Sequence, residues 1–189
     1  AVSHCTATDQ VVVTQDVVAP TVNAGTDQIL TCSSTNGINL NGSGGPAGIT
    51  YFWTGAGINA GNQTVPNPNI DLPGTYTLQV TNPVNHCTAT DQVVVSQDAN
   101  APVAVAGADQ VLDCTVSSVI IGGATTSSGP GISYVWTGPD ITAANQNQAM
   151  PTVAVDGTYI LTVNNANNGC SASDTTLVVN QVALPTASA

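Results

Sequence analysis

The chain has 189 residues and a formal net charge of −11, because it contains eleven aspartates and no lysine, arginine or glutamate. A chain without cationic side chains cannot neutralise phosphates, which excludes ordinary nucleic-acid binding, and it lacks the usual attraction to anionic lipid surfaces. Hydrophobic residues make up 42% of the chain but aromatic residues only 4%. Folding is therefore expected to depend on lean apolar cores, backbone hydrogen bonds and crosslinks.

The first segment of the chain returns one domain length later. Residues 4–13 (HCTATDQVVV) recur letter for letter at residues 86–95, and a looser copy of the pattern, GCSASD, occupies residues 169–174. A fixed period of this size is typical of a tandem array whose units all do the same work. Because chemistry needs one special site and an array needs length, the period favours a structural or adhesive protein over an enzyme.

The phase of the repeat predicts the domain boundaries. Two complete units are expected at residues 17–99 and 100–182. Residues 1–16 match the end of a unit and are interpreted as the last strand of a preceding repeat, and residues 183–189 are interpreted as the start of a following one. The chain is then a window on a longer array. The alternative is a small fibre subunit that polymerises by donating its N-terminal strand, residues 1–16, to a neighbour.

Short extended runs bounded by turn residues predict about seven strands in the first unit and no helix. We expect these strands at residues 21–24, 28–32, 38–41, 50–54, 63–65, 75–81 and 87–97. In the clearest strand, residues 75–81, Tyr76, Leu78 and Val80 share one face and polar residues occupy the other, which is typical of a half-buried strand. So many short strands in one unit predict an all-β fold of tandem β-sandwiches.

The cysteines predict crosslinks and a compartment. Each complete unit holds two cysteines, separated by 55 residues between Cys32 and Cys87 and by 56 between Cys114 and Cys170. This matched spacing predicts one disulfide inside each domain, and disulfides indicate an oxidising, extracellular location. A bridge that closes a loop of this length stabilises a domain by about 4 kcal/mol. Cys5 is left over, and its partner is expected in a neighbouring repeat or chain.

Recurring phrases along nearly the whole chain resemble a known family. The phrases of the first unit are Cys32, Trp53, PGTY at 73–76 and CTATD at 87–91; those of the second are DQVLDC at 109–114, GISYVWTG at 131–138 and GTY at 157–159. They resemble the immunoglobulin-like and PKD-like tandem repeats of giant secreted bacterial surface proteins and adhesins. The resemblance implies sandwich modules that serve as spacers, adhesins or fibre subunits, so it specifies architecture more closely than function.

The resemblance also departs from antibody domains in one informative way. In those domains the second cysteine follows the corner tyrosine by two residues, whereas Cys87 follows Tyr76 by eleven. The bridge is therefore expected to join an early strand to the start of the last strand. No immune-type binding function is implied.

The aromatic residues are candidates for the core. Trp53 and Trp136 occur once per unit inside apolar strands, and Tyr76 and Tyr159 occupy the inward face of the clearest strands. We expect all four to be buried. The alternative for the two tryptophans is an exposed platform on which sugar rings stack.

Aspartates flank the predicted junctions between units. Asp16 and Asp27 flank the first junction, and Asp98 and Asp109 flank the second at the same offsets. Hard oxygen ligands at a hinge suit calcium, which would stiffen an array, so these four residues are candidate calcium ligands. The alternative is that they cap turns, for which aspartate is well suited.

The sequence favours a non-catalytic structural segment. It contains no Ser/His/Asp arrangement, no phosphate loop and no Cys-x-x-Cys pair, and His86 is replaced by Gly169 in the second unit. We interpret the chain as part of an extracellular fibre, filament or adhesin stalk whose partners are neighbouring repeats or copies of itself. The alternative functions are an adhesive module that binds glycans or a cell surface, and the donor-strand subunit described above.

Overall fold

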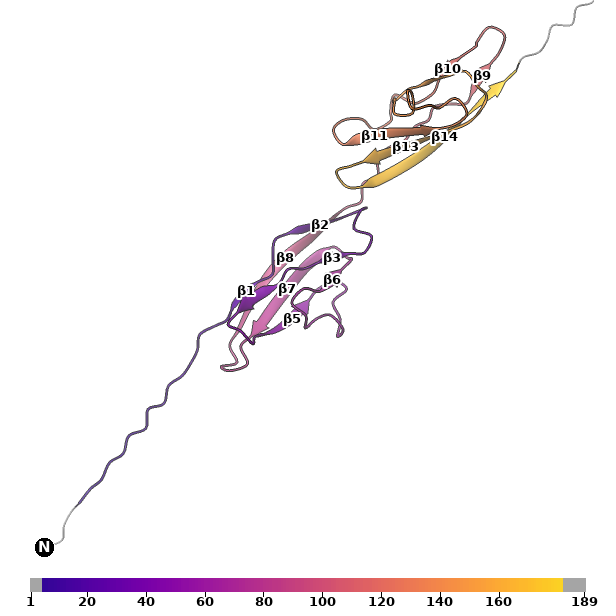
Figure 1. The fold of residues 1–189 in the computed structure, drawn as a ribbon. Helices are drawn as coiled ribbons and strands as arrows, with labels where there is room; N and C mark the ends of the chain where they lie inside the picture. The colour runs from indigo at the N-terminus through magenta and orange to yellow at the C-terminus, as the bar shows by residue number, and fades with distance from the viewer. Residues whose placement is uncertain (1–4, 182–189) are drawn as a thin grey trace, which may run out of the picture. The chain divides into compact units, whose positions relative to one another are not determined.

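The computed structural model describes residues 5–181, which contain fourteen β-strands and no helix (Figure 1). The all-β prediction is confirmed. The contacts divide the described chain into two compact units, one of residues 5–28 and 37–95 and one of residues 29–36 and 96–181. Residues 29–36, which the sequence repeat places in the first unit, thus group with the second. The predicted boundaries at 17–99 and 100–182 stay predictions.

The first sequence repeat carries eight strands. Their order in the main sheet is β2-β8-β7-β5, and two small pairs, β1-β4 and β3-β6, accompany it (Figure 1). The strands are β1 (Thr21–Asn23), β2 (Gln28–Thr31), β3 (Ile38–Asn39), β4 (Ser43–Gly45), β5 (Thr50–Thr54), β6 (Asn69–Ile70), β7 (Gly74–Thr81) and β8 (Thr88–Asp98). Strands β5, β7 and β8 form an antiparallel meander.

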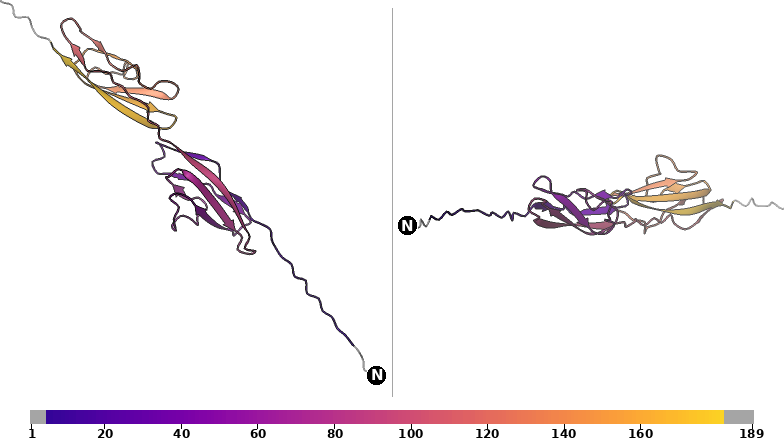
Figure 2. Two further views of the ribbon diagram at one scale, coloured as in Figure 1. Left: turned by 180° about the vertical axis from the view of Figure 1, so that it is seen from behind. Right: turned by 90° about the horizontal axis from the view of Figure 1, so that it is seen from below.

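The second repeat has the same plan. Its main sheet has the order β11-β13-β14-β9, and β10 pairs with β12. The strands are β9 (Gln110–Leu112), β10 (Val119–Ile120), β11 (Ile132–Thr137), β12 (Thr152–Val153), β13 (Gly157–Asn165) and β14 (Cys170–Asn180). The long strands lie side by side, orange to yellow in Figure 2. Strand β9 joins the end of β14 in parallel, with Gln110–Leu112 opposite Val178–Asn180.

The alternation of side chains along the long strands builds each core. Tyr76, Leu78 and Val80 of β7 are fully buried, as predicted. In the second unit the buried cluster is drawn from β9, β11, β12, β13 and β14, from the residue after β10 and from the segment before β9. Its members are Ala106, Leu112, Ile121, Trp136, Val153, Tyr159, Leu161, Val163 and Val178. With few aromatic residues, β-branched and leucine side chains supply most of this apolar surface.

One predicted strand is wrong and two were missed. Residues 63–65 lie in turns, because asparagine side chains bind the backbone there: Asn59 Oδ1 accepts a hydrogen bond from the amide of Gly61 (2.8 Å), and Asn62 Oδ1 accepts one from Asn59 (2.8 Å). Such local bonds compete with strand pairing. The missed strands are short. Strand β4 contains two glycines and β6 follows a proline, and both residue types normally indicate a turn or loop in a sequence.

The N-terminal segment is extended and exposed. Residues 5–20 form no strand, and the side chains of Val11, Val12 and Val13 are more than four-fifths exposed. That residues 1–16 are the last strand of a preceding repeat stays a prediction. Residues 183–189, the predicted start of a following repeat, lie outside the described residues. In the part of the chain that the structure describes, no helix is long and apolar enough to cross a membrane.

Each unit contains a tyrosine whose hydroxyl binds the backbone four residues earlier. Tyr76 donates to the carbonyl of Leu72 and Tyr159 to that of Val155, both at 2.6 Å. Burial and a nearby aspartate, Asp71 or Asp140, raise the pKa of each phenol. A glycine lies directly against each ring, Gly55 on Tyr76 and Gly138 on Tyr159, where a Cβ atom would overlap the aromatic carbons. This contact explains why a glycine follows Trp-Thr in both repeats.

Candidate functional site

The disulfide of this chain joins Cys32 to Cys170, which lie 138 positions apart in sequence and whose Cα atoms are 5.0 Å apart. The predicted pairs Cys32–Cys87 and Cys114–Cys170 are wrong. Cys87 and Cys114 have free thiols, and Cys5 is exposed. The predicted partner of Cys5 in a neighbouring repeat or chain stays a prediction.

The geometry of the last strand explains why the predicted pairs fail. Cys170 is the first residue of β14, whereas Cys114 follows Leu112, which lies opposite Asn180 at the other end of that strand. Ten residues of strand span about 30 Å. A disulfide needs Cα atoms less than about 7 Å apart, so Cys114 cannot reach Cys170. Equal spacing in sequence identified equivalent cysteines but not partners.

An asparagine fixes the chain beside the disulfide. The side chain of Asn168 is almost fully buried and donates to the carboxylate of Asp98 (3.1 Å) and to the carbonyl of Asn100 (3.0 Å). Its own carbonyl oxygen accepts a hydrogen bond from the amide of Cys170 (3.0 Å). One side chain thus holds both the start of β14 and the segment that leads into the second repeat. The sequence analysis missed Asn168, and the signal that could have found it is the Asn-x-Cys spacing that recurs at Asn85 and Asn168.

A glycine permits the close approach of the two cysteine-bearing segments. Gly169 has a φ of 68°, and a Cβ atom there would collide with the side chain of Ser33. Cys170 is buried, while Cys32 is exposed. We call the set of Cys32, Ser33, Asn168, Gly169 and Cys170 the junction staple.

The aspartates proposed as calcium ligands bind backbone amides. The amide of Val18 donates to Asp16 Oδ1 (3.1 Å), that of Asn100 to Asp98 Oδ1 (3.2 Å), that of Val94 to Asp27 Oδ1 (2.9 Å) and that of Leu177 to Asp109 Oδ1 (2.9 Å). These contacts fit the capping alternative. Within residues 5–181, no group of three or more His, Cys, Asp or Glu side chains converges in a way that could hold a metal ion. Calcium stays a prediction.

Two further aspartates recur with the same backbone contact in each repeat. Asp91 Oδ2 accepts from the amide of Ala24, and Asp174 Oδ2 accepts from that of Ala106, both at 2.8 Å. The hydrogen bond from Ala24, followed by one from Gln92, holds the pKa of Asp91 below its usual range. Hydrogen bonds from Asn100 and Asn168 do the same for the pKa of Asp98.

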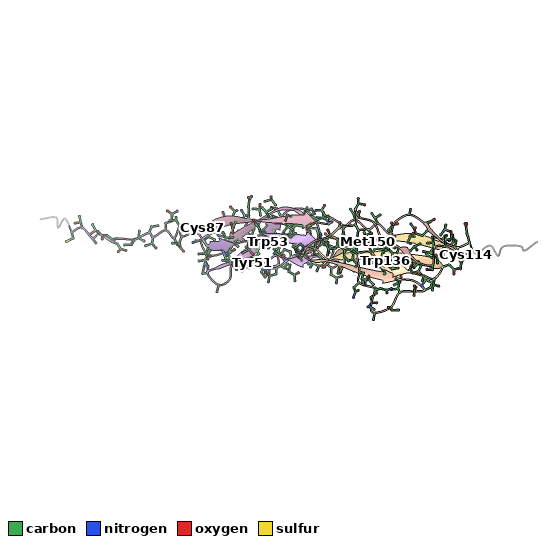
Figure 3. The ribbon with its side chains drawn as sticks, turned by 90° about the horizontal axis from the view of Figure 1, so that it is seen from above. Tyr51, Trp53, Cys87, Cys114, Trp136 and Met150 are labelled. Carbon is green, nitrogen blue, oxygen red and sulfur yellow. A yellow bond between two sulfur atoms is a disulfide. The ribbon has the colours of Figure 1, made fainter. Side chains whose placement is uncertain are left out.

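The four aromatic residues expected in the cores are all buried: Trp53, Trp136, Tyr76 and Tyr159. Figure 3 labels the two tryptophans. The indole N–H of Trp53 donates to the carbonyl of Pro66 (3.2 Å), and that of Trp136 donates to Gln148 (3.0 Å). Because neither ring reaches the surface, the sugar-platform alternative for the tryptophans is wrong.

The disulfide gives a first testable prediction. In the chain-entropy model, closing a loop of 138 residues stabilises the fold by up to about 5 kcal/mol. Cys32→Ser and Cys170→Ser should therefore each lower the melting temperature in non-reducing buffer, and Cys170→Ser by at least as much as Cys32→Ser, because Cys170 is buried. Cys114→Ser, at an exposed free thiol, is the control and should change the free energy of unfolding by less than about 0.5 kcal/mol. If Cys114→Ser lowered the melting temperature as much as Cys170→Ser, the result would support the predicted Cys114–Cys170 pair instead.

The carboxylates give a second prediction, on acid stability. Since the folded-state pKa of Asp91 is lowered, its stabilisation is complete above the unfolded-state pKa of about 3.9 and is lost as the pH falls through the folded-state value. Asp91→Asn should flatten the dependence of unfolding free energy on pH between about 5 and 2. Asp9→Asn is the matched control, because Asp9 has the equivalent sequence position but binds only the amide of Gln10. Equal acid slopes for Asp91→Asn and the unaltered chain would contradict the assignment.

Comparisons with known proteins give similarity of fold. No family model matches the chain, and no curated protein matches its sequence. Among solved structures, the chain is similar to the PKD domain of the KIAA 1837 protein, at 26% identity over 49% of this chain and 98% of that one, with a TM-score of 0.37.

Two longer structures are similar over most of the chain. An I-band fragment of titin is 12% identical over 88% of this chain and 67% of its own, with a TM-score of 0.45. The three N-terminal domains of the outer capsid protein Hoc of bacteriophage RB49 are 13% identical over 86% and 59%, with a TM-score of 0.43. The chain is thus an all-β protein with one disulfide, between Cys32 and Cys170, and the structures to which it is similar include immunoglobulin-like and PKD domains.

Proposed function

We propose that this chain is a non-catalytic, load-bearing segment of an extracellular fibre, filament or adhesin stalk. The observation that carries the proposal is the Cys32–Cys170 bond, which joins a cysteine of one sequence repeat to a cysteine of the next. Its partners would be neighbouring repeats or copies of itself. A bond inside one domain protects only that domain, whereas this bond makes consecutive repeats resist extension together.

The mechanical effect follows from the length of the closed loop. If the folded units were pulled open, the loop between the linked cysteines, which lie 138 positions apart, could not extend. Fully extended residues span 3.3–3.6 Å each, so the bond withholds about 450–500 Å of contour length. The bond would therefore still prevent most of the segment from extending after its sheets had unfolded.

Composition supports an extracellular setting. Disulfides persist in oxidising compartments, and the lack of lysine and arginine leaves trypsin-like proteases no cleavage site. Short proline-containing connections, at Pro20 and Pro102, limit the bending of the chain where repeats begin. The recurring carboxylates of Asp91 and Asp174 are engaged by backbone amides, which supports a structural rather than a catalytic use.

Single-molecule stretching tests the load-bearing role. The 189-residue chain, attached by its ends, should reach a contour length about 450–500 Å shorter in oxidising than in reducing buffer. Two bonds inside the units would withhold only about 370–400 Å, because their loops span 55 and 56 residues. Immunogold labelling of thin sections of cells then tests the location. Label confined to the interior would overturn the proposal.

A second function is favoured by the exposed N-terminal segment. Residues 6–16 repeat the sequence of β8 with one change, Ser96 to Thr14. In β8 the equivalents of Val11 and Val13, Val93 and Val95, are buried, and the equivalent of Val12, Val94, is 46% exposed. The segment therefore has the pattern of a last strand, which suits it to add to the open sheet of another unit as a donor strand.

The alternation provides a matched test of strand donation. If the segment is donated, the double variant Val11→Asp with Val13→Asp should abolish concentration-dependent oligomers seen by light scattering, because it buries two charges. Val12→Asp should leave them intact, because that side chain would face solvent. Oligomers that survive the double variant, or a chain that stays monomeric at every concentration, would exclude donation by this segment.

A further inference from the structure

We propose that the junction staple is one member of a continuous series, in which Cys114 bonds to the late cysteine of a following unit and Cys87 to the early cysteine of a preceding unit. We call Cys32 and Cys114 the early cysteines and Cys87 and Cys170 the late cysteines, by their place in the repeat. The partner is a further unit of this same repeat. The inference rests on the proposed extracellular array and names what connects its members.

The turn that carries Cys114 shares one contact with the turn that carries Cys32: a side-chain oxygen just before the cysteine accepts a hydrogen bond from the amide just after it. In the bonded turn, the side-chain oxygen of Thr31 accepts from the amide of Ser33 (3.3 Å) and its carbonyl accepts from Ser34 (2.9 Å). At the equivalent positions, the side-chain oxygen of Asp113 accepts from the amides of Thr115 (2.7 Å) and Val116 (2.8 Å). Both turns follow the short strand beside the last strand of the sheet. The thiol of Cys114 is exposed.

The loop that carries Cys87 matches the loop that carries Cys170. The side chain of Asn85 donates to the carbonyl of Val18 (3.0 Å), just as Asn168 donates to Asn100 (3.0 Å), the residue equivalent to Val18. The carbonyl oxygen of the Asn85 side chain accepts from the amide of Cys87 (3.0 Å), as that of Asn168 does from Cys170 (3.0 Å).

The backbone of the two loops also agrees. His86 has a φ of 56° and donates its amide to Asn82 (2.8 Å), whereas Gly169 has a φ of 68° and donates to Asn165 (2.8 Å). His86 is the non-glycine residue with positive φ among those described, so the loop keeps this conformation even without glycine. Cys87 is therefore presented in the same way as Cys170.

The position of each cysteine in its unit gives the series a direction. A late cysteine lies where the chain enters a unit, as the contact of Asn85 with Val18 shows, and an early cysteine lies near the end of the last strand (Figure 3). Because the last strand separates the two by about 30 Å, neither can pair within its own unit. A head-to-tail contact of this kind uses two different surfaces, so each further unit leaves one surface open for the next.

One substitution distinguishes the loop of Cys87. A Cβ atom at Gly169 would collide with Ser33, and His86 carries such an atom. In the proposed bond, the early-cysteine turn of the preceding unit must therefore lie slightly farther from His86 than Ser33 lies from Gly169. We expect the bond at Cys87 to form more slowly than the bond at Cys170, and His86→Gly to accelerate it.

The chemistry is a thiol–disulfide exchange with a small-molecule or protein disulfide as oxidant. One cysteine thiolate attacks the oxidant, forming a mixed disulfide and releasing one thiol. The second cysteine thiolate then attacks the mixed disulfide and releases the other thiol. Two cysteine thiols lose two electrons and two protons, and the oxidant is reduced to two thiols.

Disulfide mapping of the native material tests the series. After free thiols are blocked with iodoacetamide, cleavage before aspartate places all five cysteines in separate peptides: residues 1–8, 27–70, 71–90, 113–139 and 156–173. We expect 27–70 linked to 156–173, and 113–139 linked to a peptide with a late cysteine. If that peptide is 71–90, the partner is a second copy of this chain; if it is another sequence of the same pattern, the partner is a neighbouring repeat.

The remaining outcomes separate this inference from the proposed function. Alkylated Cys87 and Cys114 beside an intact Cys32–Cys170 bond would overturn the series alone. Linkage of 113–139 to 156–173, or of 27–70 to 71–90, would also overturn it. Alkylation of all five cysteines would instead overturn the proposed function, since the protein would then reside in a reducing compartment.

Variants of the 189-residue chain test the direction of pairing when mapping identifies a second copy. In a Cys5→Ser background, oxidation with glutathione disulfide should link an equimolar mixture of Cys87→Ser and Cys114→Ser into a dimer on a non-reducing gel. Each variant alone should stay monomeric, because it keeps only one kind of cysteine. Equal dimer yields from the single variants and the mixture would mean random thiol oxidation and would overturn the directional pairing.

Discussion

The structure depends on the length of the last strand in each repeat. Strands β8 and β14 have eleven residues each, far more than the two to five residues of most other strands, and they hold the sheets together by pairing on both sides. The same length keeps the early and late cysteines of one unit apart. A crosslink in such a unit has to leave it, and the covalent framework therefore follows the sequence repeat rather than the single sandwich.

The polar residues of the repeat serve this framework. The chain has no lysine or arginine to pair with its aspartates, so the carboxylates of Asp91, Asp98 and Asp174 accept hydrogen bonds from backbone amides and asparagine. For Asp91 and Asp98 these bonds stabilise the charged form and lower the pKa of the carboxyl. Segments that carry no regular pairing, such as those before β2 and β9, are fixed in this way. Asparagine and aspartate thus replace ion pairs as the polar supports of the fold.

The repeat makes local geometry transferable along the chain. The loops before Cys87 and Cys170 share their hydrogen bonds and a left-handed residue, although one uses histidine and the other glycine. In a repeat protein each unit meets its neighbours through the same surfaces. A bond observed once between an early and a late cysteine is therefore informative about every other place where the same two loops occur.

The sequence by itself determined the all-β class, the alternating faces of the long strands and the burial of residues such as Trp53 and Tyr159, because these depend on local patterns of apolar side chains. It could not determine the disulfide partners. Equal spacing relates equivalent cysteines, whereas bonding needs proximity, and proximity was decided by the parallel placement of β9 at the far end of β14. The hydrogen bond from Asn168 to Asp98 was likewise decided only by tertiary structure, since it joins residues 70 positions apart.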